Sequence, residues 1–240
     1  MMNVSNFIIE DKEKVHWTDL HLDKNSRIAL EQLLSEHSHI ELLKQYELPV
    51  NNKVIFHGSS GCGKTTTAKA IAEKLGKKMH IINLSTIVSS RIGETSQNLK
   101  MIFDKAKMEN GVLFLDEFDQ IGKARSNNER DVGEMRRLVN TLIQLIDYLP
   151  ERSLLIAATN QIEIIDKALI RRFQCVVRYR MPNNKELDNY YDTLLSRFPE
   201  DLKRIRRKYK VSYAEAKDYA YTALKSLIIT NSQNKIIPTE

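Results

Sequence analysis

The stretch from Gly58 to Thr65 restricts the fold of this chain more than any other part of the sequence. It reads Gly-Ser-Ser-Gly-Cys-Gly-Lys-Thr and fits the pattern G-x-x-x-x-G-K-[ST]. Glycines let the backbone come close to phosphate oxygens, while free N–H groups and a helix N-terminus supply positive potential. The apolar run 53–57 before the stretch predicts a short strand, and the pattern over 65–75 after it predicts a helix.

This motif assigns roles to individual residues. The Lys64 ammonium can reach the β- and γ-phosphates of a nucleotide, and the Thr65 hydroxyl can ligate Mg²⁺. Cys62 stands at a free position of the motif, where a small side chain is tolerated, although oxidation there could also block phosphate binding. The candidate nucleotide-binding residues of this stretch are Ser60, Gly61, Cys62, Gly63, Lys64, Thr65 and Thr66.

A second apolar run, 112–115, ends in the carboxylates Asp116 and Glu117. A continuous apolar run is typical of a central parallel strand that is buried on both faces. At its tip, Asp116 can hold Mg²⁺ and Glu117 can accept a proton from a water that attacks the γ-phosphate. The pair alone would also suit a solvated acidic turn, but the phosphate loop upstream favours the catalytic interpretation.

Strand and helix patterns alternate up to about residue 182. Apolar runs of strand length occur at 53–57, 79–84, 112–115, 153–158 and 174–179. Helices are expected at 28–43, 65–75, 96–108, 134–148 and 166–170, with connections at 85–94 and 122–133. The alternation predicts an α/β fold: a parallel five-stranded sheet with helices on both faces.

Only helical patterns follow residue 183, which predicts a small all-α lid domain after the sheet. The predicted divisions are an N-terminal arm (1–16), an α/β nucleotide-binding domain (17–182), the helical lid (183–230) and a C-terminal tail (231–240).

Composition excludes several classes of protein. Of the 240 residues, 42% are apolar and 28% are charged, as in a globular protein. No apolar run reaches the roughly 18 residues of a membrane-spanning helix, and the N-terminus lacks the pattern of a signal peptide. Cys62 and Cys175 form neither a disulfide framework nor a metal-ligand pattern, so we expect a cytoplasmic protein that does not enter membranes.

In their order along the chain, these motifs resemble those of the AAA+ ATPases. They are most similar to the AAA branch, which contains membrane proteases, katanin, spastin and related unfoldases. The stretch 112–117 resembles the Walker B strand of this family. The stretch 154–160 resembles the strand that carries its polar sensor, which implies that Asn160 orients the attacking water and senses the γ-phosphate. By itself, Asn160 could equally be a turn residue.

The segment 166–173 resembles the one that presents arginine fingers in this family. The resemblance implies that Arg171 and Arg172 reach into the active site of a neighbouring subunit. An isolated arginine pair would also suit a solvated helix end, where the helix dipole favours cations. The finger role makes activity depend on assembly, so we expect a homo-oligomer, and the family implies a hexameric ring.

The function that the resemblance implies is hydrolysis of ATP with Mg²⁺, coupled to remodelling of a separate protein partner. An alternative is an ATPase linked to nucleic acid, such as a loader or a transposition helper. Another alternative is a module that uses nucleotide only as a switch for assembly. The chain contains neither an H-E-x-x-H zinc motif nor a G-x-S-x-G nucleophile motif, so a second chemistry is expected to come from a partner.

Several correspondences with the family are weaker. Asp19 and Leu20 stand where the chain passes the adenine, but the usual glycine of that region is missing. Ala214 stands where many relatives carry a sensor arginine, an absence that is common in the AAA branch. Arg136 and Arg137 would lie near a subunit boundary or on a solvated helix face.

Two basic features leave the partner open. Arg91 stands where protein-threading relatives carry an aromatic residue facing the central pore. It could grip an acidic polypeptide, contact nucleic acid or serve only assembly, because a guanidinium binds carbonyls, carboxylates and phosphates. The stretch 203–210 is the most basic of the chain, and either a solvated face or a footprint for nucleic acid or an acidic protein would explain it.

Overall fold

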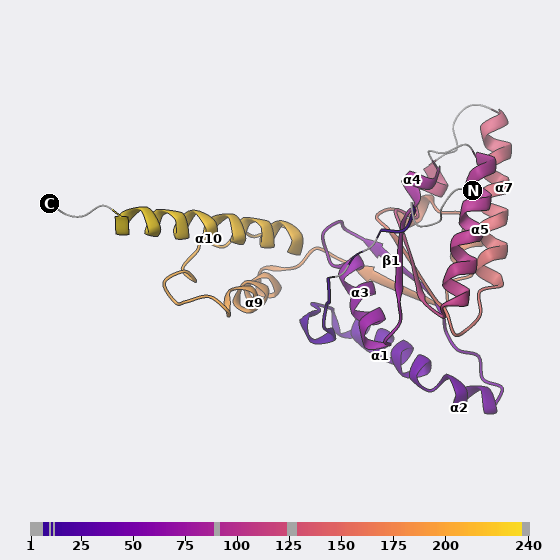
Figure 1. The fold of residues 1–240 in the computed structure, drawn as a ribbon, viewed down its shortest axis with the longest axis horizontal. Helices are drawn as coiled ribbons and strands as arrows, with labels where there is room; N and C mark the ends of the chain where they lie inside the picture. Colours follow the sequence, from indigo (N-terminus) through magenta and orange to yellow (C-terminus); the bar gives the residue numbers. More distant parts are fainter. Residues whose placement is uncertain (1–6, 10, 12, 89–91, 124–128, 237–240) are drawn as a thin grey trace. The chain divides into compact units, whose positions relative to one another are not determined.

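A five-stranded, all-parallel sheet in the order β2-β3-β4-β1-β5 forms the centre of the larger unit (Figure 1). The computed structural model describes residues 7–9, 11, 13–88, 92–123 and 129–236. This sheet, together with the helices after it, confirms the predicted fold class. The strands are β1 (Lys53–Gly58), β2 (Met79–Asn83), β3 (Val112–Asp116), β4 (Leu154–Thr159) and β5 (Cys175–Tyr179).

Helices cover both faces of the sheet, with α1 and α3 on one side of β1 and α5 and α7 on the other (Figure 1). Within the described ranges, none of them is long and apolar enough to cross a membrane. The elements of this unit are η2 (Trp17–Asp19), α1 (Lys24–Ser38), α2 (Ile40–Gln45), α3 (Lys64–Lys74), α4 (Leu84–Val88), α5 (Ile92–Met108), α6 (Gln120–Lys123), α7 (Glu129–Asp147), η3 (Ile162–Ile164) and α8 (Lys167–Ile170).

Alternate residues of each strand face opposite layers of helices. Ile55 of β1, Leu113 of β3 and Leu155 of β4 are fully buried in one apolar cluster with residues of α5 and α7. Their neighbours Phe56 and Phe114 are also fully buried, although they point to the other face. Burial on both faces explains why these strands read as continuous apolar runs.

Three predicted boundaries were wrong. The helix expected over 28–43 is interrupted at His39, where the Ser38 hydroxyl donates to the Leu34 carbonyl (2.9 Å) and weakens the regular pattern. The connection expected over 85–94 contains most of α4 and the start of α5. The loop expected over 122–133 is helical at both of its ends, in α6 and α7.

The chain folds into two compact units. The larger comprises 1–58 and 64–179, and the smaller comprises 59–63 and 180–240. The smaller unit contains α9 (Asn184–Leu195) and α10 (Tyr213–Ile236), which begin after polar caps and share an apolar core. The predicted limits of the two domains, 17–182 and 183–230, stay a prediction.

Candidate functional site

The carboxyl ends of three strands meet at one edge of the sheet. Because β4 pairs in parallel with both β1 and β3, the chain leaves β1 at Gly58, β3 at Asp116 and β4 at Thr159 along the same edge. In open parallel sheets, ligands bind just outside these ends. The residues that the sequence singled out next to each strand are therefore brought together.

Lys64 links two of these strand ends. Its ammonium donates to the carbonyl of Gly58 at 2.7 Å and to the side-chain oxygen Oδ1 of Asn160 at 2.8 Å. Lys64 is only 8% exposed, whereas Asn160 is exposed. The predicted phosphate-binding lysine and the predicted sensor thus contact each other although they lie far apart in the sequence.

Asp116 and Glu117 form a sharp turn at the end of β3. The backbone N–H of Glu117 donates to Asp116 Oδ1 at 2.9 Å. Glu117 has φ 53°, in the left-handed region that side chains rarely adopt, a strain of about 1–3 kcal/mol that is typical of functional sites. Burial raises the pKa of Asp116, and the nearby charge of Glu117 raises it further, while the Glu117 N–H and Lys64 oppose this effect.

A buried link that was not predicted from the sequence joins the ends of β3 and β4. Asp119 is 3% exposed and accepts a hydrogen bond from the Thr159 hydroxyl at 2.9 Å. The same hydroxyl oxygen accepts the backbone N–H of Gln161 (3.0 Å), which holds the residues on either side of Asn160. The backbone N–H of Phe118 also donates to the Ala158 carbonyl at 2.8 Å. A signal was available, because Asp119 completes an Asp-Glu-Phe-Asp run at the end of an apolar strand.

Glycine is required at the end of β1. Gly58 has φ +128°, and a Cβ atom there would lie 1.9 Å from the Tyr179 carbonyl oxygen. A side chain would therefore break the pairing of β1 with β5 at the point where the loop begins.

The loop residues 59–63 group with the smaller unit. The Gly61 carbonyl accepts the backbone N–H of Ala214 at 3.1 Å, at the start of α10. Cys62 is buried, with its Sγ 3.6 Å from the Ser60 carbonyl oxygen and 3.8 Å from the Met181 sulfur. The suggested oxidation of Cys62 stays a prediction.

Arg171 and Arg172 have different surroundings. Arg172 forms an ion pair with Asp147 of α7 (Nε–Oδ1 3.3 Å) and donates to the Ala168 carbonyl at 2.8 Å. Arg171 is exposed at the end of α8, and its side chain has no hydrogen bond or ion pair to a described residue. Of these two arginines, only Arg171 therefore projects a guanidinium without a partner in the described part of its own chain.

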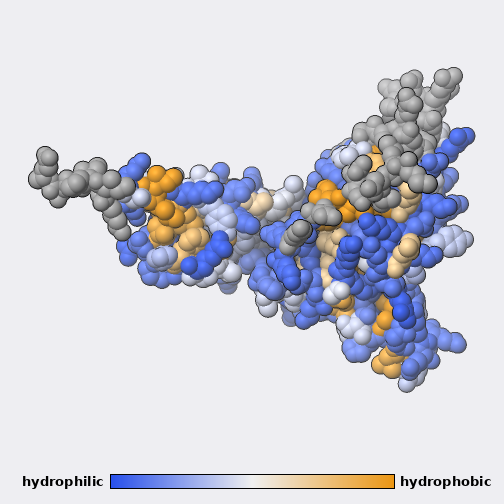
Figure 2. Space-filling model, in the orientation of Figure 1, coloured by the Kyte–Doolittle hydropathy of each residue, from blue (hydrophilic) through white to orange (hydrophobic). Residues whose placement is uncertain are grey.

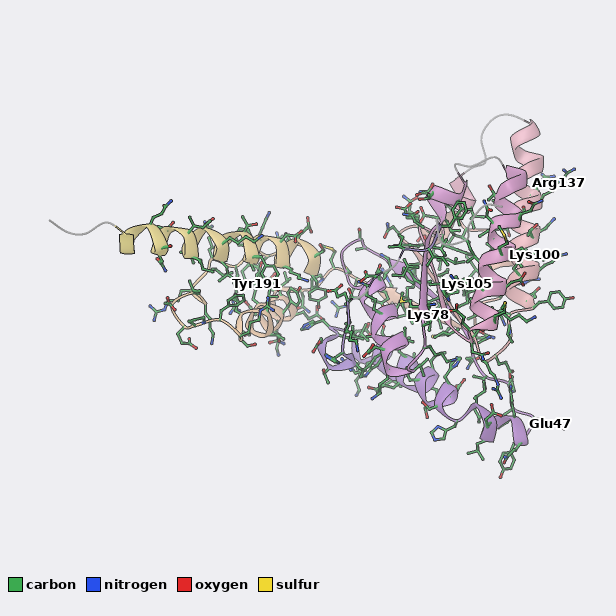
Figure 3. All side chains as sticks on the ribbon, viewed as in Figure 1. Glu47, Lys78, Lys100, Lys105, Arg137 and Tyr191 are labelled. Carbon is green, nitrogen blue, oxygen red and sulfur yellow. The ribbon has the colours of Figure 1, made fainter. Side chains whose placement is uncertain are left out.

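The remaining candidates are scattered. Asp19 is exposed and Leu20 is buried against α3 in a small apolar cluster. Ala214 is exposed, and so are Arg136 and Arg137 on α7, of which Arg137 points away from the helix into solvent (Figure 3). Arg91 lies outside the described residues.

The chemistry of the strand ends suits a nucleotide with Mg²⁺. The Thr65 hydroxyl and the Asp116 carboxylate are oxygen ligands, the type that Mg²⁺ prefers. Gly63 has φ +99°, and a Cβ placed on it would meet no atom within 4 Å, so the space that a side chain would fill is open. Backbone N–H groups next to such open space can approach phosphate oxygens.

Comparison with known proteins agrees with the resemblance that the sequence motifs indicated. Residues 54–181 match the model of the family described as "ATPase family associated with various cellular activities (AAA)". An uncharacterised AAA family ATPase of Sinorhizobium fredii is 32% identical over 208 residues, which cover 85% of this chain and 62% of that protein.

Two further relatives have more specific names. A putative 26S proteasome regulatory subunit homolog of Methanothermobacter thermautotrophicus is 30% identical over 75% of this chain and 51% of its own length. Spastin of Drosophila willistoni is 28% identical over 92% of this chain and 30% of its own length. This chain thus spans less than two thirds of the length of these relatives.

Proposed function

The chain belongs to the AAA family of ATPases, as its motifs indicated, and we propose that it hydrolyses ATP with Mg²⁺ at the strand edge around Lys64. The observation that carries this proposal is the contact of Lys64 with Asn160, beside the Asp116–Glu117 turn. This contact supports the proposal, because phosphoryl transfer requires a cation, polar groups and carboxylates close together.

We assign the binding roles as follows. Backbone amides from Ser60 to Lys64 and the Lys64 ammonium hold the phosphates of ATP. Thr65 and Asp116 hold Mg²⁺, which neutralises phosphate charge when it is bound. The raised pKa of Asp116 supports this role, because a buried carboxylate gains most from a nearby cation. Thr66, Asp19 and Leu20 stay candidates for contacts with the nucleotide.

Glu117 is assigned as the general base. Its left-handed backbone turns the chain sharply beyond the end of β3, and the link through Asp119 and Thr159 holds the neighbouring sensor, Asn160, in place. In this assignment Glu117 takes a proton from the attacking water and Asn160 orients that water. A positioned base of this kind contributes about 10²–10⁴ in rate.

We further propose that the protein works as a homo-oligomeric ring, a hexamer by family resemblance, in which the pair Arg171 and Arg172 acts on the neighbouring subunit, with Arg171 as the main contributor. An arginine supplied in trans is worth about 10³–10⁵ in rate. The exposed guanidinium of Arg171 supports this role for that residue. The names of the proteasome-subunit and spastin relatives support a protein as the partner that is remodelled, and a cytoplasmic location stays a prediction.

The test compares two substitutions in the assembled protein. Lys64→Ala is expected to abolish ATP binding, whereas Glu117→Gln is expected to keep binding and lower kcat by about 10²-fold or more. Binding is measured with a fluorescent ATP analogue and turnover by phosphate release. Glu163→Gln, an exposed acid near the same edge, is the matched control. Normal turnover by the Glu117→Gln protein would refute the assignment of the base.

A further inference from the structure

The smaller unit exposes an apolar stripe on α10. Ala216, Ala220 and Leu224 recur at every fourth position and are buried in the core of this unit. The stripe continues for another turn, but Leu227 is 37% exposed and Ile228 is 46% exposed. Apolar side chains that continue a buried stripe into solvent are typical of a surface that binds a partner.

The connection between α9 and α10 runs beside α10 (Figure 1). Its residues Leu202 and Ile205 are half-buried against the same core as Leu224. Figure 2 shows apolar side chains gathered over the distal part of α10 and continuing onto this connection. We call Leu202, Ile205, Leu227 and Ile228 the lid patch.

Two arginines flank the lid patch. Exposure alternates along the connection: Ile205 packs against the core, whereas Arg204 and Arg206, on either side of it in the sequence, are exposed. Arg207 pairs with Asp188 (2.7 Å) and with Asp192. Neither Arg204 nor Arg206 makes a hydrogen bond or a close ion pair with a described residue. A hydrogen bond from Lys203 and its charge lower the pKa of Glu200, and the charge of Arg204 adds to this effect.

The connection is held in place by a buried tyrosine. Tyr191 lies between α9 and α10 (Figure 3) and is fully buried. Its hydroxyl donates to the Lys208 carbonyl at 3.1 Å and accepts the Lys208 N–H at 3.2 Å. The guanidinium of Arg207 also lies over the Tyr191 ring, 5.8 Å from its centre. The two exposed arginines are therefore presented from a fixed backbone, which lowers the entropic cost of binding.

We propose that the lid patch, with Arg204 and Arg206, binds an acidic amphipathic helix of a partner protein. This inference rests on the proposed function and names the class of partner. Aliphatic side chains gain from an apolar partner face, and exposed guanidiniums gain from carboxylates beside that face. A nucleic acid would satisfy the arginines but leave Leu227 and Ile228 against a polar backbone, so a protein is favoured over it.

The probe is a labelled peptide of about 16 residues, with leucines at i, i+3, i+4 and i+7 and glutamates elsewhere. A matched peptide carries lysines in place of the glutamates. Binding to the full chain is measured by fluorescence anisotropy. We expect the acidic peptide to bind at least about tenfold tighter than the basic one, and less tightly as salt is added.

Two double variants locate the site. Leu227→Ser with Ile228→Ser, and Arg204→Glu with Arg206→Glu, are each expected to weaken binding of the acidic peptide about tenfold or more. Leu42→Ser with Tyr46→Ser removes exposed apolar side chains from α2 and from the residue that follows it, and is the matched control. Basal ATPase activity, expected to be unchanged in every variant, reports that the protein is folded.

Other outcomes would overturn the proposal. One is equal binding of the acidic and the basic peptide, and another is unchanged peptide affinity in both lid variants. A third is a smaller oligomer when Leu227 and Ile228 are replaced. A fourth is displacement of the acidic peptide by duplex DNA that binds Arg204 and Arg206. Absence of ATPase activity in the unmodified chain would overturn the proposed function, but it would leave the peptide result interpretable.

Discussion

Two cations of the proposed site are held in opposite ways. Lys64 is 8% exposed and is bonded to oxygens of Gly58 and Asn160 at the end of the sheet. Arg171 is exposed at the end of a short helix, and nothing in the described part of the chain binds its guanidinium. The first cation is oriented before any ligand arrives, whereas the second is available to another molecule.

This difference divides the proposed site into two parts. The strand ends are held together within one chain, whereas Arg171 is available to a neighbouring subunit. The strand ends are held together by buried hydrogen bonds, such as the one that the Thr159 hydroxyl donates to Asp119. The two arginines at the end of α8 divide in the same way, because Arg172 is tied to Asp147 of its own chain and Arg171 is not. We therefore expect substitutions at Arg171 to depend on assembly, and those at the strand ends to act within one subunit.

The largest effect should come from Arg171→Ala. If this arginine stabilises transition-state charge in a neighbouring subunit, its loss lowers kcat about 10³-fold or more, while ATP still binds. Arg172→Ala should cost much less turnover, because its guanidinium is already bound within α7 and α8. The measurements are phosphate release and ATP affinity, with oligomer size followed by light scattering.

A mixing experiment tests whether Arg171 acts in trans. Arg171→Ala retains Glu117, and Glu117→Gln retains Arg171, so mixed oligomers contain some complete sites and should regain activity. Lys167→Ala, an exposed cation of the same helix, is the matched control. No recovery of activity on mixing, or full activity of the monomer at high dilution, would contradict the idea that Arg171 acts on a neighbouring subunit.

A smaller effect is expected at Asp119, which positions the sensor strand. Asp119→Ala leaves the buried Thr159 hydroxyl without its acceptor, which should cost about 1–3 kcal/mol of unfolding free energy. Because Asn160 follows Thr159 directly, we also expect kcat to fall about tenfold with little change in KM. Asp119→Asn keeps an acceptor oxygen and should restore most of both.

Thermal unfolding and turnover are compared in the same samples of these variants. Asp104→Ala removes an exposed acid of α5 and serves as the control. A loss of stability in Asp119→Ala without any loss of kcat would assign Asp119 a structural role only.

Local sequence patterns were sufficient to predict the sheet and the residues at its edge. The apolar runs that became β1, β3 and β4 are buried on both faces, so their pattern is unusually clear. The polar residues directly after such strands must lie at one edge once the strands are parallel. That is why Lys64 and Asp116 could be expected at one edge without coordinates, whereas Asn160 was singled out only through the family resemblance.

The parts that could not be predicted depend on contacts between distant segments. The distinction between Arg171 and Arg172 arises from Asp147, which α7 brings beside α8. The hydrogen bond from Thr159 to Asp119 likewise joins two strands through side chains that no local pattern pairs. The interruption at His39 lies next to Ser38, whose hydroxyl donates to the Leu34 carbonyl, and hydrophobic periodicity does not detect such a bond.

The smallest predicted effect is a gain in stability, whereas the changes above cause losses. It is expected for Asp116→Asn. Burial raises the pKa of Asp116 above its ordinary value of 3.8. The native carboxyl therefore binds its proton more tightly than the unfolded one, so the unfolding free energy falls as the pH rises from 3.8 through the native pKa. It stays lowered at neutral pH, where the buried carboxylate is charged.

Asn keeps the acceptor oxygen for the Glu117 N–H but carries no charge, so Asp116→Asn should melt a few degrees higher than the unmodified protein at neutral pH. This difference should disappear below pH 3.8, where Asp116 is protonated in both states. Melting is followed with a chelator and without nucleotide, and Asp104→Asn is the matched control. A lower melting temperature for Asp116→Asn at neutral pH would mean that attraction to Lys64 outweighs burial. The charged form of Asp116 would then stabilise the folded protein, instead of destabilising it until a cation binds.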